Sequence, residues 1–255
     1  MAGMLDHVIA QVLVLQVRLL ACRERLAGDV DSEALHDLRT TLRRLRSLLR
    51  PLRGLPGVEQ LEEAARALGG LTTPLRDREV LAAHLISQGH EQAGVRRLEG
   101  RAGIFASVAV SRQLTRVLAI IDTFPLFLRA CAREGLASSL GKRIDKRLAK
   151  QWRKLQEALV DPSHDRHRLR LLIKRVRYGD EAYPQLEQAG KKLQRVLKRA
   201  QGDLGDWHDR VQWLLLARDH ADLASFKKAW ERELHEAEQK ADATLEALQA
   251  QLARR

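Results

Sequence analysis

The sequence predicts an all-α protein made of two helical bundles, and three observations support this prediction. Apolar residues recur at helical spacing along most of the chain, and we find no convincing alternation of apolar and polar residues of the kind that marks a half-buried strand. A basic amphipathic segment occurs twice, once in each half of the chain. Hydrophobic residues make up 45% of the 255 residues, which is ordinary for a globular protein with a buried core.

The first basic segment covers residues 36–53 and has the sequence HDLRTTLRRLRSLLRPLR. On a helix, which turns about 100° per residue, its leucines fall on one side and most of its cations fall on the adjoining side. The leucine side suits a buried core, and the cations lie at the surface beside it. We call this row of cations the first basic stripe; it consists of His36, Arg39, Arg43, Arg46 and Arg50.

The second basic segment covers residues 167–178, has the sequence HRLRLLIKRVRY and repeats the register of the first. Arg175 occupies the position that corresponds to Arg44. A single basic amphipathic helix is most often a solvated charged face. A core requires its apolar positions to recur, but packing gives no reason for a histidine and three cations to stay in register. We therefore interpret the repeat as functional, and its second copy, the second basic stripe, consists of His167, Arg170, Lys174 and Arg177.

An internal repeat sets the architecture of a chain. We treat the whole chain as one domain, with a first repeat at about residues 1–130 and a second at about 131–255. Helices of this length with short connections pack as antiparallel bundles, so we expect two bundles of the four-helix type related by a pseudo-two-fold axis. By symmetry, the two basic helices are expected to meet and to merge their stripes into one cationic groove.

Each basic helix is expected to begin after a polar N-cap residue, whose side chain accepts a hydrogen bond from a free N–H group of the first turn. The candidates are Asp31 or Ser32 for the first basic helix and Asp161 or Ser163 for the second. Pro51 is expected to kink or thin the last turn of the first basic helix, because proline lacks a backbone N–H.

Glycine and proline predict where the other helices end. We expect a break at Gly69 and Gly70, with Pro74 as the first residue of the following helix. The second repeat is expected to break in the same way at 202–206, and 124–139 is expected to connect the repeats. Besides the basic helices, the predicted helices cover about 4–27, 58–68, 74–88, 91–122, 139–160, 190–201, 207–221 and 223–252.

The charge of the chain favours a polyanionic partner. Forty-five Lys and Arg against 33 Asp and Glu give a formal net charge of +12. Such an excess suits nucleic acid, anionic lipid or a phosphate polymer. The chain has only four Trp, two Tyr and four Phe, whereas proteins that bind single-stranded nucleic acids use aromatic rings on which bases stack. This composition makes nucleic acid the less favoured partner.

The sequence predicts neither export nor a membrane span. Residues 1–20 lack a basic start, and Gln11 and Gln16 interrupt the apolar run, which indicates an amphipathic helix. Cys22 and Cys131 lie inside helical patterns without further cysteine neighbours, as buried thiols of a reducing compartment do. We therefore expect a cytoplasmic protein without a membrane partner. Common catalytic motifs and paired carboxylates do not occur, so we expect no catalytic residue, cofactor or metal site.

The two basic segments resemble the signature of the CHAD family, the conserved histidine α-helical domain. In the second half the resemblance extends to Tyr178 and Glu181, and to the segment 193–209, LQRVLKRAQGDLGDWHD. The likeness covers essentially the whole chain, although the stretch 68–77 is longer than the matching family segment. The resemblance implies two four-helix bundles with a basic central surface that binds inorganic polyphosphate. Family members occur alone, at polyphosphate granules, or fused behind a triphosphate tunnel metalloenzyme domain.

Polyphosphate suits the residues of the two stripes. It is a flexible chain with about one charge per repeat and no bases, so a row of guanidinium groups that bind phosphate oxygens is a sufficient receptor. A helical rise of about 1.5 Å per residue separates neighbouring members of a stripe by about 5–6 Å. The predicted polyphosphate-binding residues are both basic stripes with Arg44, Arg175 and Tyr178, and an outer rim of Arg18, Lys142, Lys146 and Lys150.

The sequence therefore predicts a non-catalytic polyphosphate-binding protein of the cytoplasm, associated with polyphosphate granules. Two alternatives stay open. One is a nucleic-acid-binding helical protein, because a cationic groove does not identify its polyanion. The other is a regulatory subunit of a polyphosphate-metabolising enzyme. Tyr178 has an alternative role as well, since a tyrosine at this position also suits a contact between helices.

Two further motifs have simpler explanations than a metal site. Residues 236–240, EAEQK, match the ExExK metal-binding signature of triphosphate tunnel enzymes. That signature needs a strand, and on a helix Glu236 and Glu238 point about 200° apart. His164 and His167 are three residues apart, but arginines surround them and no carboxylate or thiol cluster joins them. We therefore expect a helix cap or a surface residue at His164.

Overall fold

The computed structural model describes residues 2–161, 163, 165–187 and 189–253. These residues form helices and connecting turns with no strand among them, so the predicted all-α class is confirmed. The chain divides into two compact units: unit 1 extends to Ile144, and unit 2 begins at Asp145. The pseudo-two-fold axis and the repeat boundary near residue 130 stay predictions.

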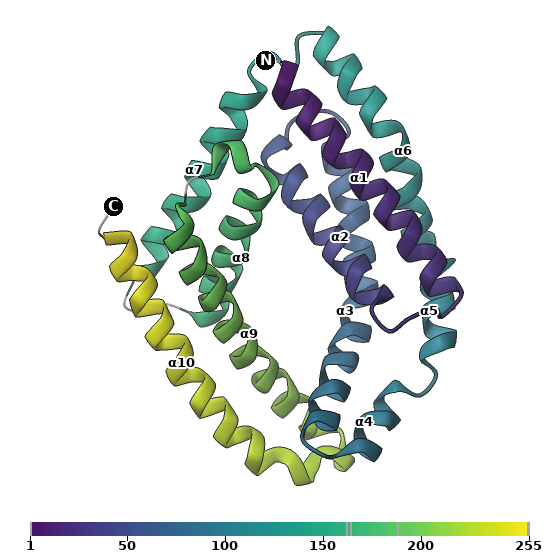
Figure 1. Ribbon diagram of the computed structural model, residues 1–255, viewed down its shortest axis with the longest axis vertical. Coiled ribbons are helices and arrows are strands. Elements are labelled where there is room, and N and C mark those ends of the chain that lie inside the picture. Colours follow the sequence, from purple (N-terminus) through teal and green to yellow (C-terminus); the bar gives the residue numbers. More distant parts are fainter. Residues whose placement is uncertain (1, 162, 164, 188, 254–255) are drawn as a thin grey trace. The chain divides into compact units, whose positions relative to one another are not determined.

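Four helices enclose the core of unit 1: α1 (Ala2–Ala27), α2 (Ala34–Leu49), α3 (Val58–Ser87) and α6 (Arg112–Arg133). Helix α2 packs against α1 and α3, and α6 packs against the same two helices, so the four form a bundle (Figure 1). Two shorter helices complete the unit, with α4 (Glu91–Leu98) packed on α3 and α5 (Arg101–Ala109) packed on α1. Each main helix contributes a fully buried residue to the core: Val12, Leu38, Leu68 and Val117.

Four helices also share the core of unit 2: α7 (Leu140–Leu159), whose first turn belongs to unit 1, α8 (Arg166–Ala182), α9 (Lys191–Asp219) and α10 (Lys227–Ala253). Helix α9 lies between α8 and α10 and packs along both (Figure 1). Two 3-10 turns, η2 (Pro184–Leu186) and η3 (Ala221–Phe226), connect the helices. One hydrophobic cluster joins the four helices through Leu155, Ile173, Leu197 and Leu248.

Both basic helices form as predicted, with their apolar sides in the core. In α2, Leu38 and Leu45 are fully buried, and in α8 Ile173 and Val176 are buried in the same way. Burial of these side chains sets the rotation of each helix about its axis, and this rotation determines where the cations of each stripe lie. Pro51 lies in the 3-10 turn η1 (Arg50–Leu52), which directly follows α2, so the predicted thinning of the last turn is confirmed.

The glycines that were predicted to break helices do not break them. Helix α3 continues through Gly69, Gly70 and Pro74, and α9 continues through Gly202 and Gly205. An interior glycine costs only about 1 kcal/mol relative to alanine. Most helical stability in proteins comes from packing; α3 packs against α2, α4 and α6, and α9 packs against α8 and α10. The four shorter helices predicted for 58–88 and 190–221 are therefore wrong, and each pair is one long helix.

Side-chain hydrogen bonds support α3 next to Pro74, which cannot donate a backbone hydrogen bond. The hydroxyl of Thr73 donates to the carbonyl oxygen of Gly69 at 2.8 Å. Arg39 of α2 donates to the same carbonyl oxygen through Nη1 at 3.2 Å. These donors satisfy a carbonyl group close to the proline, and one of them ties α3 to α2.

The segment 91–122, which was predicted as one helical tract, is divided among α4, α5 and α6. Gly100 separates the first two helices and has a positive φ of 72°, a conformation that glycine adopts without strain. Ser111 begins the third helix, because its side chain accepts a hydrogen bond from the N–H of Leu114. Helix α6 then continues through Pro125, so much of the predicted connector at 124–139 is helical.

The predicted cap of the first basic helix is wrong. Glu33 stands at the N-cap position of α2 and provides no side-chain hydrogen bond to the first turn. Asp31 accepts two hydrogen bonds from the guanidinium of Arg25, each at 2.7 Å, and one from the N–H of Glu33 at 2.9 Å. Neither Asp31 nor Ser32 therefore stands at the N-cap position, although the carboxylate of Asp31 also accepts a hydrogen bond from the backbone N–H of Ala34, the first residue of the helix.

The second basic helix is capped two to four residues later than predicted. Asp165 stands at the N-cap position of α8, and its carboxylate accepts a hydrogen bond from the backbone N–H of His167 at 2.9 Å. Asp161 instead accepts hydrogen bonds from the backbone N–H and the hydroxyl of Ser163, at 2.9 and 2.7 Å. Asp161 and Ser163 thus form a turn before the helix and do not cap it.

Two stretches are long and apolar enough to cross a membrane by length and composition alone, Gly3–Ala27 and Glu91–Arg133. The core helix of a helical protein meets the same criteria. Helix α1 packs against α2, α5 and α6 and buries Val8, Val12 and Leu19 completely. The second stretch is divided among three helices. Both stretches contribute side chains to the core of unit 1.

An added methyl group is expected to have opposite effects on stability at two helical glycines. A Cβ atom at Gly202 meets nothing within 4 Å, so Gly202→Ala is expected to stabilise unit 2 by about 0.5–1 kcal/mol. A Cβ atom at Gly94 would lie 2.8 Å from the carbonyl oxygen of Ala82, so Gly94→Ala is expected to push α4 away from α3 and to destabilise unit 1.

Urea unfolding of both variants measures these changes. A lower free energy of unfolding for Gly202→Ala would contradict a continuous α9. An unchanged value for Gly94→Ala would contradict the close approach of α4 to α3.

Candidate functional site

The first basic stripe lies on α2 and on the turn η1 that follows it. All five members are partly buried, so their stems are covered while their polar ends reach the surface. His36 and Arg43 approach one hydroxyl group: Thr40 Oγ1 accepts a hydrogen bond from Arg43 Nη2 at 3.4 Å and lies 3.5 Å from His36 Nε2. The structure thus brings these two predicted residues together.

Arg39 holds α2 against α3 as well as belonging to the first basic stripe. Its Nη1 atom donates to the hydroxyl of Thr73 at 3.0 Å and to the carbonyl oxygen of Gly69 at 3.2 Å. Burial lowers the pKa of Arg39; Asp77 opposes this effect, and neighbouring cations that include Arg43 add to it. The position therefore combines a structural contact with a partly buried charge on which both carboxylates, Asp77 and Glu79, and cations act.

The C-terminal members of the first basic stripe are Arg46 and Arg50, whose guanidinium groups lie against the surface of unit 1. The Nε atom of Arg46 is buried and has no hydrogen-bond partner within the part of the chain that the structure describes. Leaving a buried donor unsatisfied costs about 1–3 kcal/mol. Arg44 and Arg50, two and four residues away in the sequence, are also partly buried. An anion with several oxygen atoms would supply acceptors at this position.

The second basic stripe lies on α8 and gathers around a histidine of α9. The ring of His167 lies 5.5 Å from the ring of His208, measured between centroids. Burial lowers the pKa of His208 to about 4, and three members of the stripe add to this effect: Arg170, His167 and Lys174. His208 is therefore uncharged at neutral pH, and the potential around it is positive.

The C-terminal end of the second basic stripe forms a hydrogen-bonded contact with α9. Arg177 Nε donates to Gln201 Oε1 at 2.7 Å, and Gln201 Nε2 donates to the hydroxyl of Tyr178 at 3.0 Å. The guanidinium of Arg177 also lies 4.3 Å from the ring centroid of Tyr178. Tyr178 is buried in this arrangement, which favours a role as a contact between helices. Contact between Tyr178 and phosphate stays a prediction.

Two residues of the site were not predicted from the sequence, His208 and Trp207. The indole Nε1 of Trp207 is buried and has no hydrogen-bond partner among the described residues, and its ring lies 6.3 Å from that of His208. Both residues belong to the segment 193–209. The resemblance of this segment to the family was the feature of the sequence that could have indicated them. That signal marked the segment and did not distinguish which of its side chains face α8.

Arginines outside the stripes pair with carboxylates and hold the helices together. Arg53 donates to Glu62 of α3 through Nε at 2.6 Å. Arg166 donates to Asp242 through Nη2 at 2.7 Å and so joins α8 to α10. The predicted rim residues are exposed; they are Arg18, Lys142, Lys146 and Lys150. Their contact with a ligand stays a prediction.

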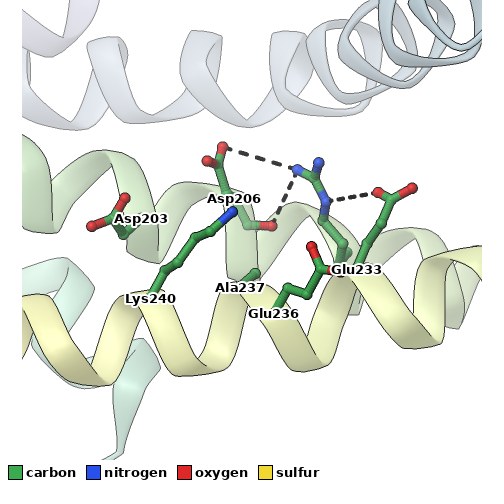
Figure 2. Close-up of a pocket in the computed structure, with 7 residues that line it drawn as sticks. Asp203, Asp206, Glu233, Glu236, Ala237 and Lys240 are labelled. Carbon is green, nitrogen blue, oxygen red and sulfur yellow. Dashed lines mark hydrogen bonds and ion pairs between the residues drawn. The ribbon is translucent and has the colours of Figure 1, made fainter.

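A small pocket lies between α9 and α10, and both acidic and basic side chains line it (Figure 2). Arg210 Nε donates to Glu233 at 3.2 Å, and Arg210 Nη1 lies 3.9 Å from a carboxylate oxygen of Asp206. The pocket has a volume of about 80 Å³, which suits a few water molecules and not a polymer. Its lining consists of Asp203, Asp206, Arg210, Glu233, Glu236, Ala237 and Lys240.

The ExExK match is split between two sides of α10, as helical geometry predicts. Glu236 and Lys240 line the small pocket toward α9 (Figure 2). Glu238 Oε1 instead lies 3.6 Å from Arg166 Nη1 of α8. Among the described residues, no three His, Cys, Asp or Glu side chains are grouped so that they could hold a metal ion. His164 lies outside the described residues.

The fold and the site define a helical protein of two bundled units, each with a row of cations beside a buried apolar face. The family model of the CHAD domain matches residues 12–218, and the chain belongs to the CHAD family. A crystal structure of the CHAD domain from the plant Ricinus communis matches with a TM-score of 0.65 and 20% identity, over 96% of this chain and 90% of that chain. This likeness establishes the shared fold. A search of curated proteins finds no match.

The contacts of Arg39 predict that removing its side chain destabilises unit 1. Arg39→Ala leaves the hydroxyl of Thr73 and the carbonyl of Gly69 without this donor, so we expect a loss of about 1–3 kcal/mol. Arg129→Ala removes the same charge from an exposed position on α6, so we expect a change within about 0.5 kcal/mol. Urea unfolding measures both variants, and equal stability would mean that Arg39 has no structural role.

Proposed function

We propose that this protein binds inorganic polyphosphate without catalysing a reaction, and that each unit contributes its basic stripe to binding. The observation that carries the proposal is the arrangement around His208: the ring of His167 lies 5.5 Å from its ring, and Arg170 and Lys174 of the second basic stripe add positive charge there. Positive potential of this kind attracts a chain of negative charges. A polyphosphate chain offers one negative charge after another and no base to recognise, which agrees with the composition of both stripes.

The donors of the two stripes support phosphate oxygen as the acceptor. Guanidinium groups bind phosphate through two parallel hydrogen bonds, and such charge-assisted bonds are about twice as strong as neutral ones. Arg46 in unit 1 and Trp207 in unit 2 each place a buried N–H group without a partner among the described residues. A phosphate chain along either surface would bring acceptors to both kinds of donor.

The carboxylates next to the second basic stripe support binding over catalysis. Phosphoryl transfer generally uses metal ions that acidic side chains hold. Glu238 and Asp242, which face α8 from α10, pair with Arg166 at 3.6 and 2.7 Å. Their role is thus to anchor the basic helix, and they do not form a free acidic cluster beside it.

Neutralising the stripe is expected to weaken binding without loss of the fold. Lys174→Gln removes one cation near His208, and we expect a loss of about 1.5–3 kcal/mol in binding, or roughly tenfold or more in Kd. The matched control is Lys228→Gln, which removes the same charge from an exposed position on α10. Titration calorimetry with polyphosphate of defined length measures both variants. Equal affinities for Lys174→Gln and Lys228→Gln would contradict a role of the second basic stripe.

Competition separates polyphosphate from nucleic acid as the partner. Medium-chain polyphosphate is expected to displace a fluorescent oligonucleotide from the protein, while excess oligonucleotide is expected to leave polyphosphate bound. The expected asymmetry follows from a site that offers cations and few exposed aromatic rings for bases. Displacement of polyphosphate by the oligonucleotide at comparable charge concentration would favour the nucleic-acid-binding alternative.

A further inference from the structure

His208 lies where α9 packs against the second basic stripe. Its ring is 5.5 Å from the ring of His167 on α8 and 6.3 Å from the indole of Trp207, the preceding residue on its own helix. His208 is partly buried, and the buried indole N–H of Trp207 has no partner among the described residues. The imidazole of His208 thus lies beside the row of cations on α8, and the indole ring of Trp207 lies next to the imidazole.

The charges that act on His208 come from α8 and are all positive: Arg170, His167 and Lys174. On α9, the neighbouring acidic residue Asp206 lies 3.9 Å from Arg210. On α10, which packs on α9, Glu233 accepts a hydrogen bond from the same arginine at 3.2 Å. These two carboxylates are therefore compensated by Arg210, and Asp209 has an interaction of its own. Together with burial, the α8 cations keep the imidazole neutral at pH 7.

We propose that His208 belongs to the phosphate-binding surface of unit 2 and takes up a proton from solvent when a polyanion binds there. This inference rests on the proposed function and adds its pH dependence. A bound phosphate chain neutralises the field of Arg170 and Lys174, which otherwise opposes a charge on the imidazole. The imidazolium then gains an anionic partner and donates a hydrogen bond to a phosphate oxygen, and Trp207 Nε1 supplies a second donor.

The direction of the pH dependence follows from linkage between proton and ligand. In the free protein, burial lowers the pKa of His208 to about 4, so the group is neutral at pH 7. Binding of a polyanion favours the protonated form and raises this pKa. Affinity is therefore expected to increase as the pH falls through the pKa of the bound state. His208 contributes an uptake of at most one proton for each unit 2 that binds a chain.

The test compares His208→Gln with wild type. Glutamine keeps a hydrogen-bonding side chain and does not titrate. The matched control is His220→Gln, which changes an exposed histidine after α9. Calorimetric titration with sodium polyphosphate in two buffers of different ionisation enthalpy, between about pH 5 and pH 8, counts the protons taken up on binding. We expect wild type and His220→Gln to take up more protons than His208→Gln and to show the steeper increase in affinity toward acidic pH.

A second measurement follows the imidazole of His208 directly. A proton NMR titration of wild-type protein, with and without saturating tripolyphosphate, is expected to show a higher pKa for His208 in the presence of the ligand. This result does not depend on the folding of a variant. Equal proton uptake in wild type and His208→Gln, with an unshifted His208 resonance, would overturn the inference and leave the proposed function intact. Absence of polyphosphate binding by wild type at every pH would instead overturn the proposed function, and this inference with it.

Discussion

Burial of one apolar face on each basic helix determines where its cations lie. Leu45 of α2 is completely buried, and the next residue, Arg46, carries its guanidinium beside the core edge. A rotation of the helix by one residue, about 100°, would expose leucines and carry arginines toward the core, where an unpaired charge costs several kcal/mol. The same constraint holds for Ile173 and Lys174 on α8. The cores of the two units thus hold the basic stripes in place.

The cations of this chain act on different neighbours. Arg53 and Arg166 pair with carboxylates and join neighbouring helices. In the second basic stripe, Arg170 and Lys174 oppose a charge on His208. Like charges at short distance oppose folding, and the apolar packing beneath them offsets this cost. A polyanion would relieve the repulsion, which is the physical link between the fold and the proposed function.

The helical class and both basic helices were predictable because apolar periodicity reports directly on which face is buried. The breaks at Gly69 and Gly202 were predicted wrongly, since local propensity of about 1 kcal/mol per glycine does not include the packing of each helix against its neighbours. The role of Arg39 in joining α2 to α3 depends on a contact between residues 30 or more positions apart. His208 was missed for the same reason, because only the pairing of α8 with α9 places it beside His167.

The central claim is that the stripes bind phosphate chains by electrostatic attraction. Its most direct measurement is the dependence of polyphosphate affinity on salt, for wild type and for a variant with Arg170→Gln and Lys174→Gln. Each cation that neutralises a phosphate contributes about 0.7–0.9 to the slope of log K against log salt in nucleic acids, through release of counterions. The account predicts a steep slope for wild type and a clearly smaller one for the variant. Affinity that is indifferent to salt, or equal slopes for the two proteins, would contradict it.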